Sequence, residues 1–289
     1  MKNILVPLTG FDNDARALEA AFSVAKRFGG RIDALRIHPD AMQIVTIAAV
    51  QQFGAQMGNV ELIHALQKNA DARSAAAQAA FDAFVKRHFP SGTDKTHDGV
   101  AASMQRSEGD PVRDTTAAAR YRDLVVLARA PEDGDFSPDA VANILVHCGR
   151  PVLLVPDKAP PVIGAKVAVA WKETPEAARA LTAAMPILAR AEKVFVLAAA
   201  ESSGKAEEAA QSAERLADEL RHHGFTVETR NVTSDAQGTA EALIGAAHAA
   251  GADLLVMGAY GHGRLRELVF GGVTRHVLKD YDLPVLMLH

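Results

Sequence analysis

The chain has 289 residues, of which 48% are hydrophobic, 23% charged and 5% aromatic. At about 150 residues per domain this length predicts two domains, and the composition excludes disordered and fibrous proteins. Because 31 lysine and arginine residues face 35 aspartate and glutamate residues, the net charge of -4 excludes a globally basic nucleic-acid binder.

The beginning of the chain and its single cysteine indicate where the protein works. Residues 1–7 are typical of a first strand, and their apolar stretch is too short for the core of a signal peptide. No apolar run reaches the roughly 18 residues that a membrane helix needs. Cys148 stands alone, which excludes an internal disulfide framework and a cysteine-based zinc site. We therefore expect a cytoplasmic protein without a membrane or nucleic-acid partner.

The sequence repeats itself. Residues 15–22 and 178–185 are identical at six of eight positions, at an offset of 163. Two apolar runs recur in the same order in both halves: Asp123–Leu127 with Asp253–Met257, and Pro151–Val155 with Pro284–Leu288. The chain is therefore predicted to be a tandem duplication.

The joint between the repeats is predicted at residues 156–161, where the density of proline is typical of an extended linker. The two domains are then expected at 1–156 and 162–289. The first is longer mainly because of residues 40–63, a mixed apolar segment without a counterpart in the second half. We interpret this segment as a helical flap over the sheet or an interface, with a dedicated ligand pocket as the alternative.

Strand and helix patterns alternate within each half. In the second half, apolar runs predict five strands: Val167–Ala170, Val194–Leu197, Phe225–Val232, Leu254–Met257 and Val285–Leu288. Thr174 followed by Pro175 predicts a helix start, and helix ends are expected near Gly224 and Gly251. Such runs between helices indicate buried parallel strands. The predicted fold is α/β, with two tandem five-stranded doubly wound parallel-sheet domains, whose ligands bind at the carboxyl ends of the strands.

A glycine pattern lies between a predicted strand and a predicted helix of the second half. Gly258, Gly261 and Gly271 are followed by Gly272 and Thr274. Glycines let a backbone approach an anion closely, and free N–H groups at a helix start favour negative charge. The pattern therefore predicts a phosphate site, with a tight structural turn as the alternative. Three arginines near the pattern are expected either to add positive charge or to lie in solvent: Arg264, Arg266 and Arg275.

The spacing G-x2-G-x9-G over residues 258–271 resembles the ATP-binding signature of the universal stress protein family. The internal repeat makes the whole chain similar to the tandem two-domain members of that family. The resemblance implies the universal stress protein fold, of the adenine nucleotide α-hydrolase-like type, with ATP, with or without Mg, as the ligand. It also implies that the two halves pair through a pseudo-twofold contact, and it leaves a further homodimer open.

By motif position, the resemblance implies a set of nucleotide-binding residues at the ends of the strands and around the glycines: Ala170, Trp171, Lys172, Leu197, Ala198, Met257, Gly258, Tyr260, Gly261, His262, Gly271, Gly272, Val273 and Thr274. Two of them depart from the family pattern. Gly272 stands where the family usually has Ser or Thr, which removes a hydroxyl donor. Lys172 stands where an aspartate is common, and it would either contact a phosphate or fill the adenine pocket.

The first half has lost the glycine pattern. Ala128 and Pro131 fall opposite Gly258 and Gly261 of the second half. Three carboxylates enter the corresponding loop: Glu132, Asp133 and Asp135. Because an acidic loop repels phosphate, we predict that the first half binds no nucleotide and serves as a structural partner domain.

Other catalytic motifs are missing from the sequence. It contains no P-loop and no G-x-S-x-G nucleophile elbow, and no residue stands out as a general base. We therefore predict no catalytic residues, no metal ligands and at most slow ATP hydrolysis; a true hydrolase is a weaker reading. His262 and His276 flank the glycine pattern and are candidates for contact with phosphate. The predicted function is a stress-response ATP-binding protein that acts through nucleotide-dependent conformation. The alternative is a nucleotide-independent scaffold with a degenerate site.

Overall fold

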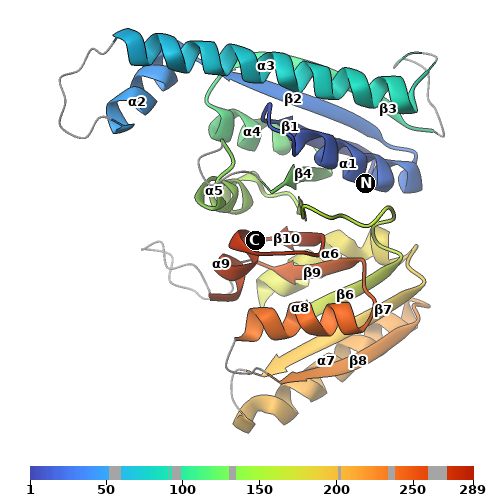
Figure 1. Ribbon diagram of the computed structural model, residues 1–289. Helices are drawn as coiled ribbons and strands as arrows, with labels where there is room; N and C mark the ends of the chain where they lie inside the picture. Colours follow the sequence, from blue (N-terminus) through green and yellow to red (C-terminus); the bar gives the residue numbers. More distant parts are fainter. Residues whose placement is uncertain are drawn as a thin grey trace. The chain divides into compact units, whose positions relative to one another are not determined.

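The computed structural model describes residues 1–51, 60–90, 92, 99–129, 135–200, 203–233, 238–259 and 272–289. The chain forms two compact units, residues 1–148 and 149–289 (Figure 1). Within the described ranges, no helix combines the length and the hydropathy that a membrane crossing requires.

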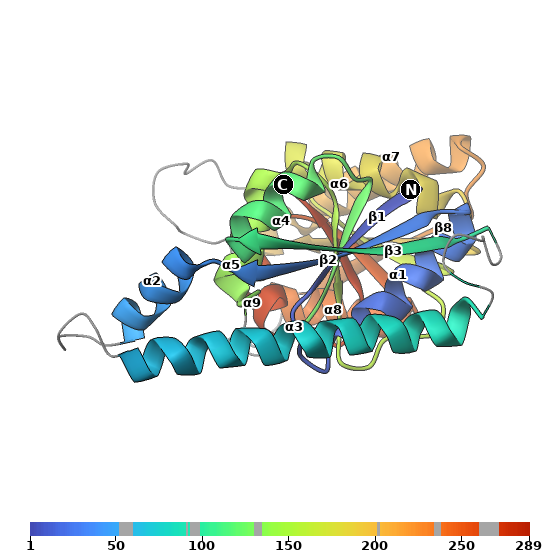
Figure 2. The same cartoon turned by 90° about the horizontal axis from the view of Figure 1, so that it is seen from above.

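Unit 1 (residues 1–148) contains a parallel sheet with the strand order β3-β2-β1-β4. Its strands are β1 (Asn3–Leu8), β2 (Arg31–Pro39), β3 (Ala101–Gly109) and β4 (Leu124–Ala128). Its helices are α1 (Asp14–Phe28), α2 (Ala41–Gln51), α3 (Val60–His88), α4 (Pro111–Ala119) and α5 (Pro138–Cys148). Helices α1 and α3 pack together on one face of β2 and β3, and α4 lies on the other (Figure 2). The central strands are buried on both faces, as their unbroken apolar runs predict.

Unit 2 (residues 149–289) has the strand order β5-β10-β9-β6-β7-β8. Its strands are β5 (Val152–Val155), β6 (Lys166–Trp171), β7 (Lys193–Ala200), β8 (Val227–Thr233), β9 (Leu254–Gly258) and β10 (Val285–Leu288). Its helices are α6 (Pro175–Leu188), the 3-10 turn η1 (Ser203–Lys205), α7 (Ala206–His222), α8 (Thr239–Ala249) and α9 (Gly272–Lys279). Strands β10, β9, β6, β7 and β8 are parallel, whereas β5 pairs antiparallel with β10.

The predicted α/β class with parallel sheets is confirmed, including several local details. The Thr174 side chain accepts a hydrogen bond from the Ala177 backbone nitrogen at the start of α6, as the Thr-Pro pattern predicts. Gly224 has the left-handed φ of 82° expected just beyond the end of α7. The last strand of the first repeat, β5, lies in unit 2, where it pairs antiparallel with β10.

The apolar segment 40–63 of the sequence contains α2 and the first residues of α3. Its helical character is therefore confirmed on either side of residues 52–59, which lie outside the described ranges. Helix α3 is much longer than α7, the helix that follows the second strand of the other repeat (Figure 1).

Candidate functional site

A cavity of about 460 Å³ opens in unit 2 at the carboxyl ends of β6 and β9. Strand β6 lies between β9 and β7, so the cavity is at the point where the strand order reverses. Ligands bind at this point in doubly wound sheets. Three helices begin at the rim of the cavity, α6, α8 and α9, so the positive ends of their dipoles lie beside it.

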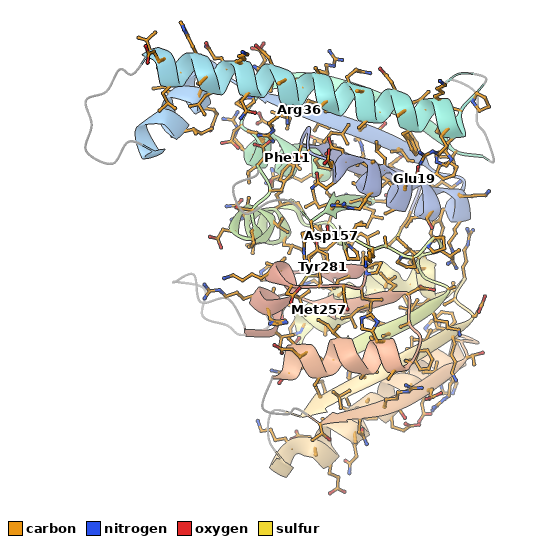
Figure 3. All side chains as sticks on the ribbon, viewed as in Figure 1. Phe11, Glu19, Arg36, Asp157, Met257 and Tyr281 are labelled. Carbon is orange, nitrogen blue, oxygen red and sulfur yellow. The ribbon has the colours of Figure 1, made fainter. Side chains whose placement is uncertain are left out.

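The structure brings a large part of the predicted site to this cavity. The predicted residues that line it are Ala170, Trp171, Lys172, Met257, Gly258, Gly272, Val273 and Thr274. Met257, labelled in Figure 3, is largely buried on β9 and forms part of the cavity wall. Four further predicted residues lie outside the described ranges: Tyr260, Gly261, His262 and Gly271.

Two predicted residues do not reach the cavity. Leu197 and Ala198 on β7 are 0% and 3% exposed and pack inside the sheet layers. Their neighbour Ala199 lines the cavity instead. The predicted contact from the second strand was therefore placed one residue too early. The reason is that β7 extends beyond the apolar run that predicted it in the sequence.

Gly258 lines the cavity but is required for packing. A Cβ atom built on it would lie 2.6 Å from the Ala177 backbone nitrogen and 2.7 Å from the Glu176 carbonyl carbon. The first turn of α6 therefore rests directly on β9 at this glycine. A Cβ on Gly272, by contrast, meets nothing within 4 Å among the described residues. The two motif glycines thus have different physical roles.

About half of the lining was not predicted. These residues come from the first turn of α6, from β7, from α8 and from α9: Thr174, Glu176, Ala177, Ala199, Gly238, Thr239, Ala240, Glu241, Leu243 and His276. The signal that could have found most of them is their place just after a strand, at a helix start, since such residues meet at the same edge of a parallel sheet. His276 was considered as a phosphate contact but not included in the predicted set.

Charges of both signs surround the cavity. Lys172 contributes a positive charge, and Glu176 and Glu241 contribute two negative ones. His276 Nδ1 lies 3.2 Å from Glu241 Oε1, so the imidazole of α9 is held against the first turn of α8. The lining also includes apolar residues, among them Ala170, Leu243 and Met257. The cavity therefore combines apolar side chains with charged groups and helix ends.

A hydrogen-bond chain holds the tryptophan of the cavity wall in place. Trp171 Nε1 donates to Ser212 Oγ at 3.1 Å, and Ser212 Oγ donates to Glu173 Oε2 at 2.8 Å. Arg215 Nη2 donates to the same carboxylate oxygen at 3.1 Å. The Ser212 and Arg215 hydrogen bonds lower the pKa of Glu173 from its ordinary value of 4.5. Helix α7 thereby fixes the indole relative to β6.

The lining of the cavity combines apolar side chains with a few polar and charged groups. In the described part of the chain, no group of three or more His, Cys, Asp and Glu side chains is placed to hold a metal ion. The volume of the cavity and its mixture of apolar walls with a few polar groups are typical of small-molecule sites. An α/β sheet with such a cavity at its switch point places unit 2 in the doubly wound class, in which small ligands bind at this position.

The universal stress protein family model matches the chain twice, at residues 1–156 and 165–289. The chain belongs to the universal stress protein family, and the predicted resemblance is confirmed. Universal stress protein Slr1230 of Synechocystis is 39% identical over 67 residues, which are 23% of this chain and 22% of that protein. Universal stress protein MJ0577 of Methanocaldococcus jannaschii is 33% identical over 81 residues, 28% of this chain and 48% of that protein. The matches thus span less than half of these curated relatives.

Two solved structures share the fold over nearly the whole chain. A universal stress protein from Archaeoglobus fulgidus superposes with a TM-score of 0.66 at 16% identity, covering 99% of this chain and 96% of that one. A putative universal stress protein from Pseudomonas aeruginosa gives a TM-score of 0.59 at 17% identity, covering 100% and 93%. At these identities the likeness shows the fold alone.

Proposed function

We propose that unit 2 binds one adenine nucleotide, with ATP as the ligand, and that the protein serves the stress response through nucleotide-dependent conformation. The observation that carries the proposal is the cavity at the ends of β6 and β9, where the helices α6, α8 and α9 begin. Helix N-termini favour phosphate, and the described glycines of the pattern, Gly258 and Gly272, line the same cavity. The family resemblance of that pattern favours ATP over other nucleotides.

The lining residues suit different parts of a nucleotide. The apolar lining residues Ala170, Leu243 and Met257 suit a purine base, whose burial is favoured by loss of apolar surface from water. The start of α9 at Gly272–Thr274 suits the phosphates, and Lys172 can add a positive charge. Mg is expected to enter with the phosphates, which are its usual ligands in nucleotide sites. Glu176 and Glu241 oppose the phosphate charge, so we expect modest affinity.

Release of bound nucleotide tests this proposal directly. Freshly purified protein is denatured without added nucleotide, and any small molecule set free is identified by mass and ultraviolet absorbance. At most one adenine nucleotide per chain is expected, because only unit 2 is proposed to hold a site. Two per chain would contradict the proposal that unit 1 lacks a site. If none is released, Mg-ATP is titrated while the emission of Trp171, the single tryptophan, is followed. The proposal would be excluded if the protein released no nucleotide and its emission did not change during the titration.

A matched pair of variants locates the site. Thr274 is 4% exposed at the start of α9 and lines the cavity, so Thr274→Val removes its hydroxyl while keeping its shape. We expect this variant to weaken ATP binding about fivefold, the value of roughly one hydrogen bond. Thr182→Val on the outer side of α6 removes a hydroxyl that bonds only within its helix, to the Ala178 carbonyl, and serves as the control. Equal affinity in both variants would place the phosphates elsewhere.

One observation favours a second candidate function, a scaffold that works without nucleotide. Helix α2 of unit 1 exposes three apolar side chains: Met42 at 73%, Val45 at 43% and Ile47 at 37%. Scattered exposed apolar residues are common, but three on one uncharged helix are typical of an interaction surface. Met42→Lys with Val45→Lys should leave ATP binding unchanged under the nucleotide proposal. If the pair abolishes the stress phenotype without affecting ATP binding, the scaffold is favoured.

A further inference from the structure

The strand registers of the two units identify equivalent positions beside the central strands. In unit 2, Ala198 on β7 pairs with Trp171 at the end of β6. In unit 1, Arg36 on β2 pairs with Leu8 at the end of β1. Where unit 2 has a methyl group, unit 1 therefore has a guanidinium group. The Arg36 side chain is only 2% exposed, between β2 and α3 (Figure 3).

The buried guanidinium of Arg36 is held at the carboxyl edge of the sheet. Its Nη1 donates to the carbonyl oxygens of Leu8 and Thr9 at 3.2 and 3.1 Å, and its Nε to Ser74 Oγ on α3 at 3.2 Å. Its Nη2 is buried and has no hydrogen-bond partner among the described residues. Burial lowers the pKa of Arg36, which measures the cost of placing a charge here. Such a group requires a nearby anion.

That anion is the carboxylate of Asp135, which lies just before α5 and is 14% exposed. Arg73 on α3 binds it with two parallel hydrogen bonds, Nη1 to Oδ1 at 3.1 Å and Nη2 to Oδ2 at 2.5 Å. Arg36 Nη1 donates to the same Oδ2 at 3.3 Å. One carboxylate is thus shared by two guanidinium groups. This is the bidentate geometry with which arginine also binds phosphate.

Helix α3 closes the space around this ion pair. Arg73 Nε donates to the Thr9 carbonyl at 2.9 Å, and its guanidinium carbon lies 4.3 Å from the centre of the Phe11 ring. Gly10 has a φ of +80°, and a Cβ on it would collide with the Arg73 carbonyl oxygen. The turn after β1 is therefore in direct contact with α3. The corresponding turn of unit 2, at Lys172 and Thr174, lines the open cavity.

We propose that Arg36 and Arg73 form a binding site for a small oxyanion, a carboxylate or phosphate group, and that the Asp135 carboxylate is its built-in occupant. The two arginines supply two positive charges, and Asp135 supplies one negative charge in direct contact with them. The nearby carboxylate of Asp14 is bound by the Thr9 and Gly10 backbone nitrogens and the Thr9 hydroxyl instead. Unit 1 thus holds, with its own side chain, the kind of group that unit 2 is proposed to take from solution.

Chemical rescue tests the proposal in the full-length protein. Asp135→Ala removes the occupant and leaves two arginines unpaired, which strongly destabilises a buried site. Thermal unfolding is measured in about 50 mM sodium phosphate and in sodium chloride of equal ionic strength. The variant should unfold at a lower temperature than the wild type in chloride. Phosphate should raise its Tm by at least about 2 °C more than it raises that of the wild type.

A second substitution assigns the response to the arginines. In the double variant Asp135→Ala with Arg73→Gln, the additional phosphate effect should disappear. Any effect of phosphate binding by unit 2 on Tm is the same in the wild type and the variants, so it cancels in the comparison. The result is therefore independent of the nucleotide proposal. An equal response of the wild type and Asp135→Ala, or a response that survives Arg73→Gln, would overturn the inference.

Asp135→Asn keeps the size of the side chain and covers the case in which the alanine variant is poorly folded. If either variant folds in phosphate but not in chloride, the oxyanion site is supported. If both stay unfolded in phosphate as well, rescue has failed and the proposal is wrong.

Discussion

Gly258 at the end of β9 and Ala177 in the first turn of α6 are in backbone contact, with 2.6 Å between the position of a Gly258 Cβ and the Ala177 nitrogen. The glycine therefore allows a helix to rest on a strand. Glycines in nucleotide-binding motifs often serve helix–strand packing as well as ligand approach. Substitutions of Gly258 consequently report on folding before they report on binding.

We expect Gly258→Ala to lower the free energy of unfolding by about 1–3 kcal/mol in the absence of nucleotide, because backbone atoms of α6 have to move. Denaturant unfolding of the ligand-free protein measures this. Gly245→Ala, in the middle of α8 with nothing within 4 Å of the added methyl group among the described residues, is the control. It should stabilise the protein by about 0.5–1 kcal/mol. Equal effects of the two substitutions would contradict the packing role.

Gly272→Ser should strengthen nucleotide binding. Residue 272 is the first of α9, is exposed and has no described residue within 4 Å of an added Cβ, so a serine would place a hydroxyl at the helix start. One additional hydrogen bond to a phosphate corresponds to an increase in affinity of about fivefold. Titration with Mg-ATP, followed by Trp171 emission or calorimetry, gives the dissociation constant. Gly272→Ala controls for the change in helix propensity, and the same gain in both variants would rule out a role for the hydroxyl.

Glu241→Gln should also strengthen ATP binding, by electrostatics. Glu241 lines the cavity in the first turn of α8, and glutamine keeps a partner for His276 while removing a negative charge. An increase in affinity of about threefold to tenfold is expected at low ionic strength, and screening should reduce it at high salt. Glu208→Gln, exposed on α7 and absent from the cavity lining, is the matched control. A salt-independent gain would indicate a steric effect instead.

The Trp171–Ser212–Glu173 chain should make tryptophan emission sensitive to acid. The pKa of Glu173 is lowered in the folded protein, so its carboxylate contributes stability above its ordinary pKa of 4.5. That contribution is lost as the pH falls below 4.5 and through the lower pKa of the folded state. We expect the emission of Trp171 to shift in that interval while far-ultraviolet circular dichroism remains native. In Glu173→Gln the shift should be missing, and its persistence would assign the acid response to another group.

Local features of the fold and the site could be predicted from the sequence. The buried strands and the Thr174 helix start follow from patterns that extend over a few neighbouring positions. The repeat follows from matching segments of the two halves, and the eight predicted residues that line the cavity follow from the resemblance to a known family. The limit of the second strand was missed at Ala199, because alanines carry little hydrophobic signal. Residues at the start of α8 were missed because only their place after the third strand of the repeat indicated them, and the prediction followed the glycine pattern and the first two strands instead.

The closed site of unit 1 shows why the rest could not be predicted. Loss of glycines and gain of acidic residues indicated that unit 1 has no nucleotide site. The Arg36–Asp135 pair, however, joins residues 99 positions apart, and Arg73 comes from a third element, α3. Asp135 was interpreted as a charge that repels phosphate. In the structure it is itself the ligand of two arginines.

The antiparallel pair of β5 and β10 is centred on Leu153 and Leu286, which are equivalent residues of the two repeats. Leu154 faces Val285 and Val152 faces Met287, so the pairing is self-complementary. A chain with a single repeat could form the same pair only with a second molecule, whereas tandem repeats hold both strands at a high effective concentration. The pair also covers the edge of β10, an uncharged apolar strand that would otherwise be a template for aggregation. Duplication has thus made the protection of this strand edge independent of protein concentration.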